Sequence, residues 1–157
     1  MRIVVVSDSH NSFSALHRLI KAEPKAELFI HLGDGEPEFE SLHRGCPDKR
    51  MIFVKGNSDW GSHSKDEDMV TCLGKQIFFT HGHRYGVKQG LDLLHRRAKS
   101  LGADIALFGH THIAMNLYHG GIHLLNPGSI ALPRDGAPSY GVIDLTEERP
   151  YLGIVRL

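Results

Sequence analysis

The chain has 157 residues, of which 41% are apolar, so it is long enough to bury one core, and we expect a single domain spanning residues 1–157. Its 18 basic and 18 acidic residues balance, which gives no indication of a nucleic-acid-binding or membrane-surface patch. No stretch approaches the roughly 18 consecutive apolar residues of a membrane span. The two cysteines, Cys46 and Cys72, form no metal-binding pair or disulfide framework, so we expect free thiols in the cytoplasm.

The first half of the chain alternates strands and helices. Short β-branched runs predict buried strands, and apolar residues at helical spacing predict the helices between them. This alternation is typical of parallel βαβ units in an α/β fold. In chain order, we expect a strand at 2–7, a helix that starts near Ser12 or Ser14, a strand at 28–32, a helix at 36–44 and a strand at 51–54.

The second half contains more strands, several of them paired as hairpins. Gly120-Gly121 is a strong hairpin signal, and Gly102 predicts the end of a helix. We therefore expect two packed sheets with helices outside them. The predicted elements are strands at 69–73 and 76–80 joined at Gly74-Lys75, a helix at 91–101, and strands at 105–108, 115–118, 122–125, 140–145 and 151–156.

Histidine is over-represented, with 12 residues, about three times its usual share. Several histidines fall with acidic residues where a predicted strand ends. Because ligands of α/β sheets bind at the carboxyl ends of the strands, we expect these residues to converge there. The seven candidate ligands are Asp8 and His10, then Asp34, then Asn57, then His81, and finally His110 and His112; His83 lies two residues after His81.

The spacing and chemistry of these residues favour a metal centre. In an extended chain, residues i and i+2 face one side, so Asp8 and His10 can bind one ion, and so can His110 and His112. Mixed oxygen and nitrogen ligands suit Mn²⁺, Fe²⁺ or Zn²⁺ better than Ca²⁺. A single zinc needs about four ligands, whereas seven suffice for two ions that share a carboxylate. Two such ions are the usual clamp for phosphoryl displacement.

The chain resembles the calcineurin-like metallophosphoesterases, and within them the short bacterial and archaeal phosphodiesterases. The family pattern is D-x-H, G-D, G-N, an H-type motif and G-H-x-H, and the resemblance spans nearly the whole chain. Any one of these motifs is weak, but five in the right order are specific. Here they read Asp8-Ser9-His10, Gly33-Asp34, Gly56-Asn57, His81-Gly82-His83 and Gly109-His110-Thr111-His112, followed by Asn126-Pro127-Gly128-Ser129, which this branch also carries.

The resemblance implies a four-layer α/β/β/α sandwich of two mixed sheets flanked by helices. It also implies two divalent ions, with Mn²⁺ expected first and Fe²⁺, Zn²⁺ or Ni²⁺ as alternatives. A hydroxide bridging the ions would attack phosphorus in line with the leaving group, and a homodimer or larger homo-oligomer is a family-level expectation. By resemblance, one ion is held by Asp8, His10, Asp34 and His112. The other ion is held by Asp34, Asn57, His81 and His110, so that Asp34 bridges the two.

One position departs from the family pattern. Many members place after the asparagine a histidine that can protonate the leaving group, but this chain has Ser58, whose hydroxyl is a poor general acid. Besides Arg84 and Lys55, no basic residue lies beside the motifs, which favours diesters over monoester dianions. We therefore expect a phosphodiesterase acting on small phosphate esters, with Asp34, Asn57 and His83 as candidate catalytic residues.

Three other functions are considered. The first is a phosphomonoesterase of the same fold. The second is a non-catalytic protein-binding scaffold like the retromer subunit, which shares this fold but has lost ligand residues, whereas all seven positions are filled here. The third, a metallo-β-lactamase-like hydrolase, lacks its expected HxHxDH run in this sequence.

Several further residues have more than one reading. His83 either supports a metal ligand, binds substrate or is a plain loop residue. Asp59 either orients the loop near Asn57 or forms a local turn, and 126–129 is either a pocket wall or a structural turn. We expect Trp60 to anchor its loop on the core rather than to stack on substrate, and Arg134 offers only weak evidence of a phosphate contact. His31 is expected in the core or behind a metal ligand, and the surface histidines are expected to be His17, His43, His63, His95, His119 and His123.

Overall fold

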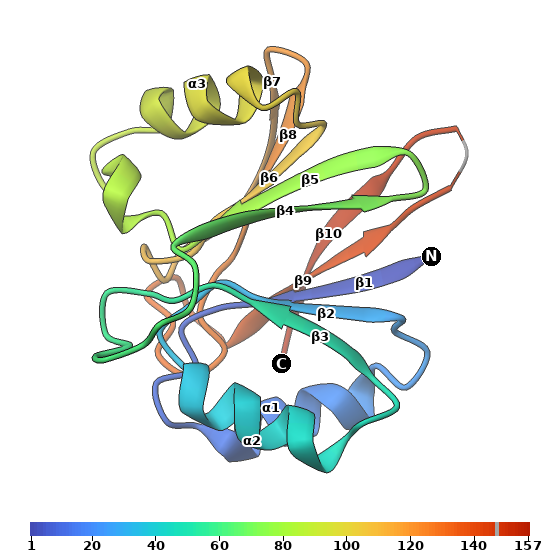
Figure 1. Cartoon of the computed structure of the whole chain (residues 1–157), viewed down its shortest axis with the longest axis vertical. Helices are drawn as coiled ribbons and strands as arrows, with labels where there is room; N and C mark the ends of the chain where they lie inside the picture. Colours follow the sequence, from blue (N-terminus) through green and yellow to red (C-terminus); the bar gives the residue numbers. More distant parts are fainter. Residues whose placement is uncertain (147) are drawn as a thin grey trace.

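The computed structural model describes residues 1–146 and 148–157 and shows two five-stranded mixed sheets packed face to face (Figure 1). The first sheet has the order β10-β9-β1-β2-β3. Its β1, β2 and β3 are parallel, while β9 runs antiparallel to β1 and β10 antiparallel to β9. The strands are β1 (Arg2–Val6), β2 (Leu28–His31), β3 (Arg50–Phe53), β9 (Ser139–Asp144) and β10 (Tyr151–Arg156).

The second sheet has the order β4-β5-β6-β8-β7. Its three central strands are parallel, and each edge strand pairs antiparallel with its neighbour. Both sheets therefore direct the carboxyl ends of their parallel strands to loops, and these loops gather on the left of Figure 1. The strands are β4 (Glu67–Cys72), β5 (Lys75–Thr80), β6 (Ile105–Leu107), β7 (Ala114–His119) and β8 (Ile122–Pro127).

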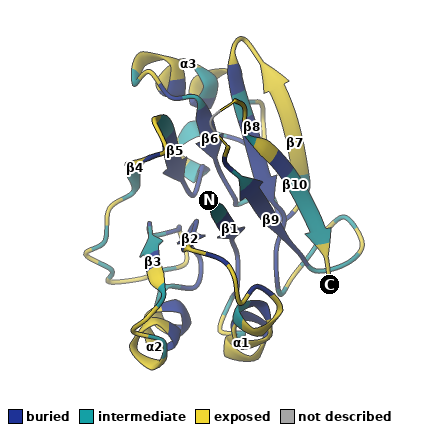
Figure 2. Ribbon diagram, turned by 90° about the vertical axis from the view of Figure 1, so that its right-hand side faces the viewer, coloured by how far each residue is buried: buried dark blue, intermediate teal, exposed yellow. Residues whose placement is uncertain are grey.

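Helices cover the outer faces of the two sheets, which makes four layers and confirms the predicted α/β/β/α sandwich (Figure 1). Helices α1 (Phe13–Ala22) and α2 (Glu36–Gly45) lie against the first sheet, and α3 (Asp92–Ser100) lies against the second. Figure 2 shows the buried residues concentrated on the sheets and on the inner sides of the helices.

Alternation along the strands separates the layers of the core. In β1, Ile3 and Val5 pack between the sheets, whereas Val4 and Val6 pack under α1 and α2. Because both faces of this strand are covered, all four side chains are fully buried. Each phenylalanine of β5 likewise belongs to a different layer, with Phe79 between the sheets and Phe78 under α3.

The predicted elements are all present, with two differences. The β4–β5 hairpin turns at Leu73-Gly74 and not at Gly74-Lys75, because Cys72 pairs directly with Lys75. Leu73 (φ 45°) and Gly74 (φ 75°) both adopt the left-handed backbone that a tight two-residue hairpin requires. A short 3₁₀ helix, η1 (His83–Tyr85), was not predicted. Within the described part of the chain, no helix combines the length and apolar character needed to cross a bilayer.

Candidate metal centre

The loops that follow β1, β2, β3, β5 and β6 meet at one end of the two sheets (Figure 1). Backbone hydrogen bonds join the first two loops, from Asp8 N to the Gly33 carbonyl (3.1 Å) and from His10 N to the Asp34 carbonyl (3.0 Å). This end of the molecule brings together all seven predicted ligands, in two overlapping clusters.

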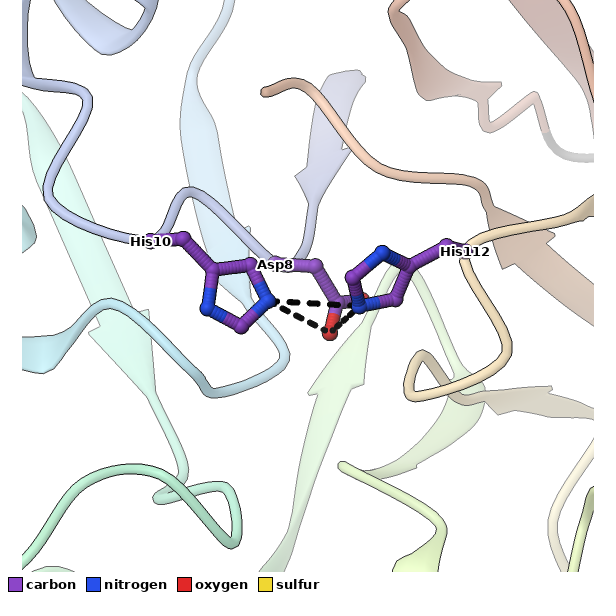
Figure 3. A group of neighbouring side chains, drawn as sticks. All are labelled: Asp8, His10 and His112. Atoms are coloured by element: carbon purple, nitrogen blue, oxygen red, sulfur yellow. Dashed lines mark hydrogen bonds and ion pairs between the residues drawn. The ribbon is translucent and has the colours of Figure 1, made fainter. Parts of the chain in front are cut away.

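The first cluster contains Asp8, His10 and His112 (Figure 3). Oδ1 of Asp8 lies 3.2 Å from Nε2 of His112 and 3.9 Å from Nε2 of His10. The two imidazole nitrogens are 3.2 Å apart and approach the carboxylate from opposite sides. Asp8 is fully buried, so its charge lies out of contact with solvent.

The second cluster surrounds His81. Its Nε2 atom lies 3.5 Å from Oδ2 of Asp34, 3.1 Å from Oδ1 of Asn57 and 3.1 Å from Nδ1 of His110. Asp34 also reaches the first cluster, because its Oδ2 lies 3.9 Å from Nε2 of His10. Asp8 lies 4.0 Å from His81, so both buried carboxylates stand between the clusters.

The backbone of these loops turns through left-handed conformations. The described non-glycine residues with positive φ number seven, and five of them are candidate ligands. Asn, Asp and His adopt this conformation more readily than other side chains do, and such positions collect at functional sites. The five are Asp8 (56°), His10 (41°), Asp34 (59°), His110 (68°) and His112 (60°).

This left-handed backbone corrects one expectation. An extended chain would direct both members of an i, i+2 pair to one ion. Asp8 and His10 do share a cluster, but His112 faces Asp8 while His110 faces His81. The 110–112 loop therefore supplies one histidine to each cluster, as the family resemblance implied and the spacing did not.

Backbone carbonyls orient two of the histidines. Nδ1 of His81 donates to the Leu32 carbonyl (2.8 Å), and Nδ1 of His112 donates to the Leu132 carbonyl (2.7 Å). A carbonyl oxygen only accepts, so in each neutral ring the lone pair is on Nε2, which is the atom that faces the carboxylates. This is the usual support of a metal-binding histidine.

The donor set fits divalent cations. Oδ1 of Asp8 is buried and has no hydrogen-bond partner among the described residues, although three imidazole Nε2 atoms lie within 4.0 Å of it. In the neutral rings of His81 and His112, the Nε2 lone pair faces the lone pairs of the Asp8 carboxylate. A cation satisfies all of them at once, and oxygen with imidazole nitrogen suits first-row divalent metals.

The titration of these groups reflects their packing. Burial, followed by the nearby His81, lowers the pKa of His110 to about 4, which keeps the ring neutral. When His112 is protonated, its Nε2–H donates to Asp8, which raises the pKa of His112 above its usual value. Burial alone would raise the pKa of Asp8, but the protonated forms of His112 and His81 lower it below the ordinary range.

Asp59 joins two of the metal-site loops. Its Oδ2 atom accepts hydrogen bonds from the backbone N–H groups of Asp34 and Gly56, both at 2.7 Å, and Oδ1 accepts from Gly35 (2.9 Å) and Glu36 (3.0 Å). Burial would raise the pKa of Asp59, but these four hydrogen bonds lower it. Of its two readings, the structure supports loop orientation. A side chain at Gly56 could not fit, because its Cβ would lie 2.0 Å from Oδ1 of Asp34.

The 126–129 stretch supports the metal loops from behind. Asn126 donates to the Gly109 carbonyl (2.9 Å) and to the Thr111 hydroxyl (3.0 Å). Ser129 donates its hydroxyl hydrogen to the carbonyl of Asp8 (2.8 Å). Both side chains are fully buried, so the structural reading applies here and the pocket-wall reading does not.

The remaining site residues fall at different distances from the clusters. The ring centroid of His83 lies 5.4 Å from that of His81, and its buried Nδ1 atom has no partner within the described chain. Burial is the main cause of a lowered pKa for His83.

Ser58 donates its hydroxyl hydrogen to Oδ2 of Asp34 (3.0 Å) and its backbone N–H to Oδ1 of the same residue (2.8 Å). Arg134 is exposed, and only its backbone N–H contacts the site, at the carbonyl of His112.

One prediction about this loop is wrong. Trp60 does not anchor its loop on the core, because 91% of its surface is exposed. The carboxylate of Asp59 holds the loop instead, so the indole is free to face solvent.

A buried chain of hydrogen bonds behind the site was missed. His31 is fully buried, its Nδ1 accepts from Gly33 N (3.1 Å) and its Nε2 contacts the Ser9 hydroxyl (2.9 Å). Ser9 in turn donates to Oε1 of Glu38 (2.7 Å). The sequence placed His31 in the core or behind a ligand, but nothing in it connects Ser9 to a glutamate of α2.

The fold and the cluster define a class, the metal-dependent hydrolases that use carboxylate and imidazole ligands at strand ends. The calcineurin-like phosphoesterase superfamily domain matches residues 1–148, and the chain belongs to this superfamily. It is a metallophosphoesterase of the short bacterial and archaeal branch, as the motif pattern predicted.

The relatives agree with this assignment. The chain is 39% identical over 150 residues to "Probable metallophosphoesterase YsnB" of Bacillus subtilis, a match that covers 94% of this chain and 86% of that protein. It is 30% identical over 172 residues to phosphodiesterase YfcE of Escherichia coli K12, covering 92% of this chain and 88% of the relative.

Solved structures show the same fold. A conserved protein from Streptococcus pneumoniae TIGR4, described as a predicted phosphoesterase, superposes with a TM-score of 0.84 at 26% identity, covering 99% of this chain and 88% of that one. Vps29 of Entamoeba histolytica complexed with Zn²⁺ has a TM-score of 0.79 at 21% identity, covering 100% and 98% of the two chains. Because the identity to Vps29 is only 21%, this similarity shows a shared fold and nothing further.

Proposed function

We propose that this metallophosphoesterase is a dinuclear phosphodiesterase that hydrolyses small phosphate diesters. The observation that carries the proposal is the pair of overlapping clusters, in which two buried carboxylates stand between imidazole groups on both sides. Seven ligand side chains exceed the need of one ion.

The two ions would be held as the resemblance implies, by Asp8, His10 and His112 on one side and Asn57, His81 and His110 on the other, with Asp34 shared. When bound, they would supply Lewis acidity and a water of lowered pKa. Mn²⁺ is the ion we expect first, and Fe²⁺, Zn²⁺ and Ni²⁺ fit the same donors.

The residues of the chain contribute positioning. Ser58 donates to the carboxylate of Asp34, and Asp59 accepts from its backbone N–H. These hydrogen bonds orient Asp34 before substrate binds. We assign His83 to the substrate side of the second cluster, because its unpartnered nitrogen lies beside His81 and His110.

The preference for diesters is supported by charge and by the relatives. Arg84 pairs with Asp66 at 3.0 Å, and Lys55 lies 3.9 Å from the same carboxylate, which offsets one of the two positive charges that could neutralise a monoester dianion. YfcE, the E. coli relative, is itself named a phosphodiesterase.

A protein-binding scaffold is the alternative of a different class. The likeness to Vps29 supports it only through the fold, whereas the complete ligand set of this chain supports a hydrolase. A scaffold would bind its partner protein without hydrolysing phosphate esters, so metal-dependent hydrolysis distinguishes the two functions.

The test is hydrolysis of bis-p-nitrophenyl phosphate and p-nitrophenyl phosphate by metal-stripped protein, with and without Mn²⁺. We expect no release without metal and faster release from the diester with it. Equal activity after EDTA treatment would exclude the metal centre, and faster release from the monoester would make the protein a phosphomonoesterase. No release despite two bound ions would favour the scaffold.

Two further assignments belong with this proposal. We place the protein in the cytoplasm, since both cysteines are free thiols, with Cys72 buried and Cys46 half-buried.

We also propose that the protein forms a homo-oligomer. Light scattering tests this directly by measuring the molar mass in solution.

A further inference from the structure

A cavity of about 390 Å³ opens beside the metal centre. Its inner end is lined by His10 and Asp34 of the centre and by Ser58, and it extends between the start of α2 and the 58–62 loop. Any diester whose phosphate contacts the metal ligands can place one organic substituent in this space.

The wall formed by α2 is acidic. Glu36, Glu38 and Glu40 line the cavity, and none of its described lining residues is lysine or arginine. Glu40 lies 3.7 Å from Arg44 and is the only one of the three with a basic partner among the described residues. Acidic side chains in a first helical turn stabilise a helix, but that role does not require them to face a cavity.

Glu38 carries a second and independent observation. Only 7% of its surface is exposed, and its Oε1 atom accepts from the Ser9 hydroxyl and from the backbone of Asn11, both at 2.7 Å. Its Oε2 atom has no hydrogen-bond partner in the described chain. Glu36 repeats the pattern, with Oε1 bonded to the Ser64 hydroxyl (2.6 Å) and Oε2 unpartnered. Each of these two carboxylates beside the cavity thus has one buried oxygen without a partner, so hydrogen bonds offset its negative charge only in part.

Trp60 adds an aromatic ring to the lining of the cavity. Its indole is 91% exposed and lines the cavity from the 58–62 loop. A cavity lined by both a tryptophan ring and carboxylates attracts organic cations, through the ring face and through charge.

We propose that this cavity selects diesters in which one substituent is a small alcohol carrying an ammonium group; the proposal rests on the phosphodiesterase function above. The phosphate would be attracted to the positive metal centre and the ammonium group to the acidic wall. A cavity lined by charge of one sign concentrates ligands of the opposite sign and repels substituents that carry further phosphates or carboxylates.

A pair of ligands of equal shape tests the cavity without turnover. Choline methylphosphonate and 3,3-dimethylbutyl methylphosphonate differ only in the positive nitrogen, which is carbon in the second. We expect Mn²⁺-loaded protein to bind the choline ester about tenfold more tightly by calorimetry. Equal dissociation constants would overturn the proposal.

Three variants locate the selectivity. Glu38→Gln, Glu36→Gln and Trp60→Ala should each lower the ratio of the two dissociation constants, while Glu148→Gln, at an exposed glutamate in the β9–β10 connection, should leave it unchanged. Glutamine at 38 keeps an oxygen for Ser9 and Asn11, so folding should be retained. An unaltered ratio in all three variants would place the selectivity outside this cavity and overturn the assignment.

The p-nitrophenyl esters of the same two alcohols separate this proposal from the function on which it rests. A tenfold higher kcat/KM for the choline diester supports both. Selective binding without hydrolysis of either ester would support the cavity and reject the phosphodiesterase, whereas equal hydrolysis of both esters would reject the cavity alone.

Discussion

Nε2 of His10 and Nε2 of His112 face each other at 3.2 Å, with the buried Oδ1 of Asp8 beside both. Without a metal ion, a proton between the two rings separates their lone pairs, and the raised pKa of His112 favours this ring as its carrier. A divalent ion must displace that proton in order to bind.

We therefore predict that Mn²⁺ binding releases protons and strengthens as the pH rises to the raised pKa of His112. Calorimetric titrations in two buffers of different ionisation enthalpy measure the number of protons released. In His112→Asn, the release should fall and the affinity should drop by more than about 10- to 100-fold, the loss that follows removal of a residue that only supports a ligand. Proton uptake on binding would contradict this arrangement.

Asp34 is the carboxylate that we propose the two ions share. Asp34→Asn removes its charge and should lower metal-dependent hydrolysis of bis-p-nitrophenyl phosphate by about 100-fold or more. Asp48→Asn makes the same change at an exposed position between α2 and β3 and serves as the control. If Asp34→Asn retained most of its activity, the shared role of this carboxylate would be wrong.

Asp59 should matter for stability as well as for activity. Asp59→Asn exchanges one carboxylate oxygen for an N–H₂ group that cannot accept, so two of the four backbone N–H groups lose their partner. We expect the free energy of unfolding to fall by about 2–4 kcal/mol. Urea denaturation with EDTA present measures this without any contribution from metal, and a loss below about 0.5 kcal/mol would show that solvent replaces the carboxylate.

Much of the fold could be predicted because local patterns and tertiary packing agree. Ile3 to Val6 is continuously apolar since both faces of β1 are covered, and the strand could be placed from that run alone. The meeting of the candidate ligands could be predicted because parallel strands direct their carboxyl ends to one edge.

Other features depend on contacts that no local pattern encodes. An isolated tryptophan is expected to be buried, but Trp60 is exposed because Asp59 already holds its loop. The i, i+2 rule failed at His110 and His112 because it assumes an extended backbone, whereas both residues have positive φ. Glu38 was invisible as a site residue because its partner, Ser9, lies in another loop.

Ser58 offers a test of how the leaving group is handled. Its hydroxyl is bonded to Asp34, and the residue is exposed, so Ser58→His would add a proton donor and a positive charge on the open side of the centre. We expect the ratio of monoesterase to diesterase activity to rise about tenfold, because the monoester carries the extra negative charge. Ser58→Ala, which removes only the hydroxyl, is the control. Equal ratios in the two variants would mean that position 58 does not face the substrate.

The last prediction concerns His31, whose pKa is lowered to about 4, chiefly by burial. The folded protein keeps this ring neutral, but the unfolded chain protonates it below about pH 6.5. The unfolded state therefore binds more protons between pH 6.5 and 4, and the free energy of unfolding of metal-free protein must fall as the pH falls through this window, by about 1.4 kcal/mol per pH unit for one histidine.

His31→Gln should flatten this dependence, although the variant is less stable at every pH because the ring is removed from the core. His110, with a pKa also lowered to about 4, continues to contribute in the same direction. His112 acts outside the window, since a raised pKa gives stability that is complete below pH 6.5 and is lost only above it. Urea denaturation at several pH values with EDTA measures the slope. An unchanged slope in His31→Gln would show that the buried ring is protonated in the folded protein, and that the His31–Ser9–Glu38 chain carries a charge which its geometry does not suggest.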